Sequence, residues 1–281
     1  MQSNTVTEIG ASDISSQYLD SLRDSGFCVI PSVVDLNLID RARVLTDEII
    51  AYAEEGLEDP FWRYYLRHRN DQGVLYDLYQ RHPEFQTLAK NPQVLATLTG
   101  VLGEDVFLYE NSLVYKPSGR ANAVPWHQDF LSRPDEPMKY IAWITLDAVT
   151  VENGTLKVIP GSHHQGYLPW QRIKGETHHD RVLEKYVKEE EAVFVEMAAG
   201  DALIFDARLL HSSDECHSDK PRRAYRISYQ GFDTLTTPRG TPIVLHGGRP
   251  SSLRQRYSQS YQAEPKWKDF LRRVGKRLAK I

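Results

Sequence analysis

The sequence predicts a mainly β protein with a helical layer at its N-terminus, and three observations support this fold class. After about residue 105, short segments rich in β-branched and aromatic residues alternate with Gly, Pro, Asn and Asp. The preceding hundred residues instead carry apolar residues at helical spacing. No repeat and no low-complexity linker interrupts the 281 residues. We therefore expect one domain over residues 1–281, with a β-sandwich or barrel as its core.

The helical layer is expected over residues 12–104. Ser12 or Ser15 can cap a first helix that stops at Gly26. The apolar run at residues 27–30 is typical of a short strand, because a proline follows it.

A second helix is expected to start after Asp35, a residue type that caps helices well. Its apolar residues recur at helical spacing at positions 38, 42, 45, 49 and 52. Residues 60–104 predict further helices, broken near Pro83, Pro92 and Gly103.

The β core is expected over residues 105–235. The charged stretch 171–191 is expected to be a surface insertion or lid rather than a strand. At the end of the chain, residues 265–281 predict a basic amphipathic helix that packs on the domain, with a membrane-surface or partner-binding helix as the alternative. The expected strands are residues 106–116, 139–149, 154–159, 192–197, 201–210 and 224–232.

Composition argues against several classes of function. Lys and Arg number 34 against 38 Asp and Glu, which gives a net charge of −4 and no general affinity for nucleic acid or an anionic membrane. Cys28 and Cys216 are the two cysteines and show no zinc-binding spacing. The N-terminus is polar and no run approaches about 18 apolar residues. We expect a soluble cytoplasmic protein, and the sequence does not indicate its oligomeric state.

Two residues in the segment 126–130 are candidate metal ligands. His127 and Asp129 stand two apart, so on a strand both side chains project from the same face. Alone, such a pair is more often a surface pair or a structural hydrogen bond. His211 follows an apolar strand that begins after the turn at Gly200-Asp201, and it can complete the set. Two histidines and one carboxylate form the facial triad of non-heme iron(II) oxygenases, which leaves open positions at the metal.

A fixed cation for a dicarboxylate cosubstrate is the next requirement of that chemistry. Arg222 follows His211 by eleven residues, and Arg223 is its competitor. Neighbouring residues on a strand face opposite ways, so only one of the two can point into a barrel.

These features together resemble the phytanoyl-CoA dioxygenase family of iron(II)/2-oxoglutarate oxygenases. The resemblance runs from about residue 15 to 232 and implies a double-stranded β-helix (jelly-roll) core. The matching elements are Gly26-Phe27-Cys28-Val29-Ile30-Pro31, His127-Gln128-Asp129, Trp143, Asn153-Gly154-Thr155-Leu156, Ile159-Pro160-Gly161-Ser162-His163, Gly200-Asp201, His211-Ser212-Ser213 and Pro221-Arg222-Arg223-Ala224.

The resemblance also implies roles and cofactors. Iron(II) is held by His127, Asp129 and His211, which are both the catalytic and the metal residues. The cosubstrate 2-oxoglutarate is bound by Arg222, preferred over Arg223 by the family spacing, and by Ser213, with Trp143 beside it. O2 is the oxidant, and ascorbate is a candidate reductant.

The substrate is the open part of the sequence interpretation. Tyr109, Asn111, Trp126 and Phe130 are candidates for the wall of a substrate cavity, and core packing is the alternative for each. We expect hydroxylation of a small molecule in a specialised-metabolite pathway, with demethylation or desaturation as variants. The alternatives are an acyl-CoA hydroxylase, a halogenase, which Asp129 disfavours because halide needs that position, and a non-catalytic jelly-roll binding protein.

Overall fold

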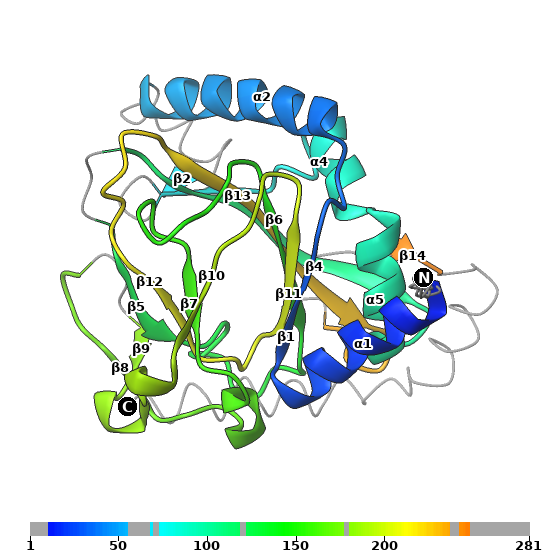
Figure 1. Cartoon of the computed structure of the whole chain (residues 1–281), viewed down its shortest axis with the longest axis vertical. Coiled ribbons are helices and arrows are strands. Elements are labelled where there is room, and N and C mark those ends of the chain that lie inside the picture. The colour runs from blue at the N-terminus through cyan, green and yellow to red at the C-terminus, as the bar shows by residue number, and fades with distance from the viewer. Residues whose placement is uncertain are drawn as a thin grey trace, which may run out of the picture. The chain divides into compact units, whose positions relative to one another are not determined.

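The computed structural model describes residues 11–55, 68–69, 73–118, 122–176, 180–236 and 242–247 (Figure 1). The expected C-terminal helix at residues 265–281 lies outside the described residues. No helix in the described part of the chain is long and apolar enough to cross a membrane.

Among the described residues, four α-helices form the predicted helical layer: α1 (Ala11–Asp24), α2 (Leu36–Glu55), α4 (Pro83–Ala89) and α5 (Pro92–Leu102). The predicted cap of α2 is confirmed, because the Asp35 carboxylate accepts a hydrogen bond from the backbone N–H of Asn37 at 2.9 Å. The expected break near Pro92 is also confirmed. There the Asn91 side chain caps α5, and proline occupies the first turn, where no N–H is needed.

Two antiparallel sheets form the jelly-roll core, which confirms the predicted fold class. In the eight-stranded sheet the order is β1-β11-β6-β13-β4-β3-β2, and β14 also pairs with β4. The four-stranded sheet has the order β10-β7-β12-β5. The large sheet consists of β1 (Phe27–Ile30), β2 (His68–Arg69), β3 (Val74–Tyr76), β4 (Val106–Lys116), β6 (Tyr140–Thr145), β11 (Ala202–Asp206), β13 (Arg222–Gly231) and β14 (Ile243–His246). The small sheet consists of β5 (Val124–His127), β7 (Leu156–Val158), β10 (Val193–Val195) and β12 (His211–Ser213).

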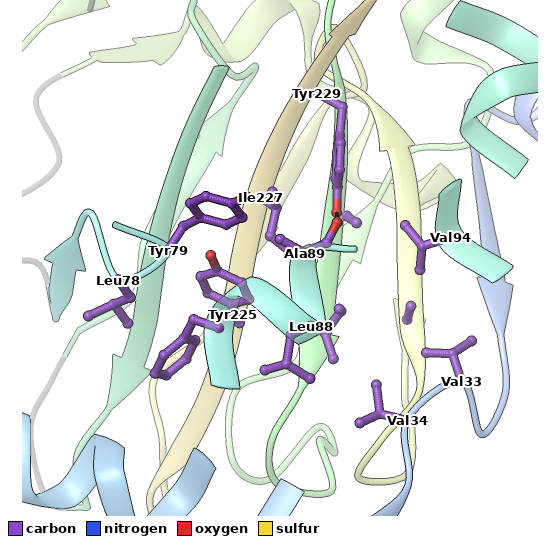
Figure 2. Packing of buried hydrophobic residues seen from close by; sticks show 14 of the residues in the cluster. Val33, Val34, Leu78, Tyr79, Leu88, Ala89, Val94, Tyr225, Ile227 and Tyr229 are labelled. Carbon is purple, nitrogen blue, oxygen red and sulfur yellow. Dashed lines mark hydrogen bonds between the residues drawn. The ribbon is translucent and has the colours of Figure 1, made fainter. Parts of the chain in front are cut away.

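Strand β13 separates the two halves of the core, because alternate residues face opposite sides. Tyr225, Ile227 and Tyr229 pack toward the helices, as Figure 2 shows, and the Tyr229 hydroxyl donates to the Ala89 carbonyl of α4 at 3.0 Å. The intervening positions, including Ala224, face the interior between the sheets. The helices thus fix the register that turns one set of β13 side chains inward.

The charged stretch 171–191 differs from the expectation. It contains a two-stranded hairpin, in which β8 (Trp170–Arg172) pairs with β9 (Asp180–Val182), so the expectation of a surface insertion or lid rather than a strand is corrected: the segment carries two short strands. The Arg172 guanidinium and the Asp180 carboxylate form an ion pair at 2.6 Å between paired positions. Val182 is buried in a cluster with Leu168 and Leu210, and Tyr186 and Val187 pack against the same cluster, so a few apolar residues anchor a charged segment. Two short 3-10 turns, Glu184–Tyr186 and Glu189–Glu191, complete the segment.

Candidate metal and cosubstrate site

The three predicted ligand residues meet at one end of the small sheet. His127 is the last residue of β5 and pairs directly with His211, the first residue of β12. Their ring centres are 4.1 Å apart. Asp129 lies just beyond β5, where its backbone N–H donates to the Ala207 carbonyl at 2.8 Å. One ligand atom from each of the three residues lies within 4.8 Å of the others. The structure therefore brings together the residues that the sequence proposed as a metal site.

Both imidazoles are held with one ring nitrogen turned away from the site. Nδ1 of His127 is 2.9 Å from the Pro125 carbonyl, and Nδ1 of His211 is 2.9 Å from the Leu209 carbonyl. A neutral imidazole that donates from Nδ1 keeps the lone pair on Nε2 for a metal. Burial lowers the pKa of His127, and burial together with His127 lowers the pKa of His211 to about 3. Both rings are therefore neutral at pH 7, as metal ligation requires.

The Asp129 carboxylate has one oxygen engaged and one available. Oδ1 forms an ion pair with the Arg226 guanidinium at 2.7 Å. Oδ2 is buried and has no hydrogen-bond partner within the part of the chain that the structure describes. Burial opposes ionisation, but Arg226 and the two histidines keep the pKa of Asp129 below its usual value. A buried anionic oxygen without a partner, beside two Nε2 atoms, fits an iron(II) ion by charge and by donor type.

A cavity of about 240 Å³ adjoins these ligands. It is partly open and is lined by residues of the large sheet, chiefly from β4, β6 and β13, and by residues of β5, β7 and β12 of the small sheet. Besides the triad, the lining residues include Lys116, Phe130, Trp143, Ser213, Arg222 and Arg226.

Arg222 is the inward arginine of the predicted pair. Its side chain lines the cavity and is 3% exposed, and its guanidinium carbon lies 5.0 Å from the centre of the Trp143 ring. Among the described residues, Arg222 has no ion pair and its Nε has no hydrogen-bond partner. Burial lowers its pKa to about 10, so it remains charged at pH 7. The hydroxyl of Ser213, on the same cavity, is also buried without a partner in the described structure. A buried cation and an unpaired hydroxyl together are suited to an anionic ligand.

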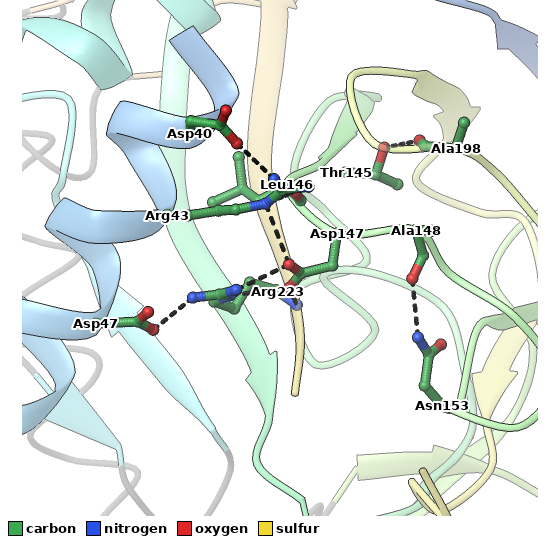
Figure 3. A network of polar contacts seen from close by, with 10 residues as sticks. All are labelled: Asp40, Arg43, Asp47, Thr145, Leu146, Asp147, Ala148, Asn153, Ala198 and Arg223. Atoms are coloured by element: carbon green, nitrogen blue, oxygen red, sulfur yellow. Dashed lines mark hydrogen bonds and ion pairs between the residues drawn. The ribbon is translucent and has the colours of Figure 1, made fainter. Parts of the chain in front are cut away.

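Arg223 points to the opposite side of the sheet (Figure 3). Its guanidinium binds the Asp147 carboxylate at 2.8 Å and the Asp47 carboxylate of α2 at 2.5 Å. These two acids compensate its charge, so Arg223 ties α2 to the sheet.

The four candidate substrate residues occupy different environments. Phe130 lines the cavity and adopts a left-handed backbone conformation, with φ of 61°. Tyr109 stacks edge-on against Phe130, with ring centres 5.3 Å apart. Asn111 is fully buried, and its side chain bonds the Tyr79 backbone N–H and the hydroxyl of a β13 tyrosine. Trp126 packs against the cluster that anchors the hairpin. Of the four, only Phe130 is among the described residues that line the cavity, and the substrate roles stay predictions.

Arg226 is a site residue that the sequence reasoning missed. The alternation of side chains along a strand could have identified it, because Arg226 stands four residues after Arg222 and therefore faces the same side. Lys116 stands directly opposite Arg222 in the register of β4 and β13 and also lines the cavity. The cavity lining therefore includes two arginines on β13, Arg222 and Arg226, and a lysine on the neighbouring strand β4.

Comparisons with known proteins agree with this geometry. The family model of phytanoyl-CoA dioxygenase (PhyH) matches residues 22–224. Dioxygenase lolE1 of Epichloe uncinata is 27% identical, over 78% of this chain and 84% of its own. L-Proline trans-4-hydroxylase of Streptomyces griseoviridis is 31% identical, over 61% of this chain and 69% of its own.

Solved structures share the fold. EvdO2 from Micromonospora carbonacea var. aurantiaca, crystallised with 2-oxoglutarate, superposes with a TM-score of 0.59 at 22% identity, over 83% of this chain and 95% of its own. At that identity the likeness concerns the fold, while the family match covers most of the chain. The protein thus belongs to the phytanoyl-CoA dioxygenase family and is an iron(II)- and 2-oxoglutarate-dependent oxygenase that uses O2.

Proposed function

We propose that this oxygenase oxidises a C–H bond of a small metabolite, with iron(II) held by His127, Asp129 and His211. The single observation that carries the assignment of the site is the convergence of ligand atoms from two histidines and Asp129, whose Oδ2 is buried without a partner in the described structure. That set leaves one side of the metal open for cosubstrate and O2. Each ligand is fixed by a backbone contact, so the site is preorganised without an ion.

In this proposal 2-oxoglutarate lies between the metal and Arg222, the first residue of β13. Arg222 binds its distal carboxylate, because that guanidinium is buried without an anionic partner among the described residues. Ser213 donates a hydrogen bond to the same group, and the Trp143 ring supports the guanidinium from one face. When bound, iron with 2-oxoglutarate and O2 supplies the oxidation of the C–H bond.

The cavity wall then orients substrate and keeps water from the metal. Phe130 follows the ligand Asp129 directly and places an aromatic face on the cavity. Hydroxylation is the proposed outcome, with demethylation or desaturation as variants that begin at the same C–H bond. Halogenation is disfavoured, because Asp129 occupies the position that a halide would need.

A small metabolite of a specialised pathway is the proposed substrate. Relatives include a proline hydroxylase and ectoine dioxygenases, whose names indicate small substrates. A cavity of about 240 Å³ has room for a molecule of that size. An acyl-coenzyme A, suggested by the name of the family, would have to extend beyond this volume. The proposed compartment is the cytoplasm, supported by the two free cysteines and by the need to keep iron ferrous.

The test is succinate release from 2-oxoglutarate under air, with iron(II) and a panel of amino acids, cyclic amino acid derivatives and acyl-coenzyme A esters. We expect succinate release coupled to a new oxygen or a new double bond in one small substrate. His127→Ala, Asp129→Ala and His211→Ala should each abolish turnover and weaken iron binding while the protein stays folded, as circular dichroism would show. Retained iron-dependent activity in any one of them would remove that residue from the metal site.

A further inference from the structure

We propose that Arg226 is a positioning residue that holds Asp129 by one carboxylate oxygen, so that the other oxygen alone binds the metal. The inference rests on the proposed metal site. It adds to that site the residue that determines how many coordination positions of the metal are occupied by the protein.

Arg226 forms ion pairs with two carboxylates. Nη2 binds Oδ1 of Asp129 at 2.7 Å, and Nη1 binds Oε1 of Glu110 at 3.3 Å. All three side chains are largely buried, with exposed fractions of 14% for Arg226, 11% for Asp129 and 7% for Glu110. Arg226 faces the cavity on β13, and Glu110 comes from the neighbouring strand β4. A planar guanidinium between two carboxylates has little freedom to rotate, so its Nη2 stays directed at Oδ1.

The backbone of Asp129 is fixed independently. Its N–H donates to the Ala207 carbonyl, and the next residue, Phe130, has a positive φ that turns the chain sharply at this point. The Arg226 guanidinium carbon lies 5.5 Å from the Phe130 ring centre. With backbone and Oδ1 both held, rotation of the carboxylate that would bring both oxygens to one ion requires breaking the ion pair.

The consequence for the metal is a matter of coordination number. A carboxylate that binds by one oxygen leaves three positions open beside two imidazoles, and 2-oxoglutarate with O2 needs three. A carboxylate that binds by both oxygens would occupy one of them. Glu110 takes part of the charge of Arg226, so the guanidinium directs Asp129 without neutralising it completely.

The experiment uses cobalt(II) as the probe, since its visible absorption depends strongly on coordination number and it does not turn over. Purified full-length protein is titrated with cobalt(II), followed by 2-oxoglutarate. We expect Arg226→Gln to weaken cobalt(II) binding about 10- to 100-fold, the range found when the partner of a metal ligand is removed. Its cobalt(II) spectrum should differ from that of the unmodified protein, and 2-oxoglutarate should change it less. Arg226→Lys keeps the charge but not the fork, so we expect an intermediate affinity and an altered spectrum.

Arg223→Gln is the matched control. It removes a largely buried arginine with two carboxylate partners from the same strand, but on the face away from the cavity. It should lower thermal stability and leave the cobalt(II) affinity and spectrum unchanged. Equal effects of the two glutamine variants on cobalt(II), or a spectrum of Arg226→Lys identical with that of the unmodified protein, would overturn the role of Arg226.

A failure of the metal site itself gives a different result. In that case His127→Ala binds cobalt(II) as tightly as the unmodified protein does, and the proposed site and the role of Arg226 fall together. Loss of binding in His127→Ala, with unchanged binding in Arg226→Gln, overturns only the positioning role.

Discussion

At the scale of single residues, the two neighbouring arginines of β13 have opposite electrostatic surroundings. Arg223 has two carboxylate partners, whereas Arg222 has none among the described residues and lines the cavity. We expect Arg222→Ala to weaken 2-oxoglutarate binding by roughly 30-fold or more, because a charge-assisted contact in a closed site is worth about 2–5 kcal/mol. Arg223→Ala should mainly lower the melting temperature. Calorimetric titration with 2-oxoglutarate in the presence of manganese(II) measures the affinity of both variants, and thermal denaturation measures their melting temperatures. A larger loss of affinity for Arg223→Ala would contradict the assignment.

We expect Lys116 to make the binding of 2-oxoglutarate dependent on pH. Its ammonium lies opposite Arg222, is buried, and donates to the carbonyl oxygens of Ser213 and Asp214. Burial, reinforced by Arg222, lowers the pKa of Lys116 to about 7. The group is therefore charged below pH 7 and increasingly neutral above it. A bound dicarboxylate favours the charged form, so binding above pH 7 should take up a proton.

The expected observation is an affinity for 2-oxoglutarate that falls between pH 6 and pH 9. Proton uptake can be measured by titration calorimetry in two buffers of different ionisation enthalpy. Lys116→Met should bind more weakly and show a much smaller dependence on pH over this range. An unchanged slope in that variant would assign the proton to another group.

At the scale of elements, we propose that the hairpin of β8 and β9 acts on substrate rather than on the metal. Strand β9 lies against β5, which carries His127, while the hairpin residues do not belong to the described lining of the cavity. Val182 anchors it in an apolar cluster. Arg172 and Asp180 are paired positions, so a two-residue turn can join them without disturbing the ladder.

In the shortened variant, a two-residue turn joins Arg172 directly to Asp180. We expect this variant to retain metal and 2-oxoglutarate binding and to lose substrate-coupled succinate release. Limited proteolysis with and without substrate gives a second measurement, since a segment ordered by substrate becomes protected. Full turnover in the shortened variant would show that the segment is a solvated surface element.

At the scale of the whole molecule, β13 joins the helical layer to the cavity. Ile227 is fully buried in the helix-facing cluster, and its neighbour Arg226 faces the interior. We expect Ile227→Ala to cost about 2–5 kcal/mol of unfolding free energy, as large-to-small changes in a packed core do. Chemical denaturation measures it. Metal affinity at low denaturant should remain close to that of the unmodified protein, and a large loss would mean that β13 shifts as a unit.

Much of this organisation was accessible from the sequence. The second helix, its Asp35 cap and the run of core strands from residue 106 follow from spacing and capping chemistry. The donor types at 127, 129 and 211 indicated a metal site because few chemistries use that set. The rule that only one of Arg222 and Arg223 can face inward followed from strand geometry alone.

The tertiary structure decided those features for which local sequence patterns allow more than one arrangement. Both faces of β13 are buried, so its pattern of apolar residues does not show which face is the interior; the packing of Tyr225 and Tyr229 on the helices does. The meeting of His127 with His211 depends on the pairing of two strands far apart in sequence. The hairpin at 170–182 escaped prediction because its strands are only three residues long and lie in a charged segment, and composition does not report the pairing of Arg172 with Asp180. Sequence determined which groups are available for chemistry, and long-range pairing decided which of them face the same cavity.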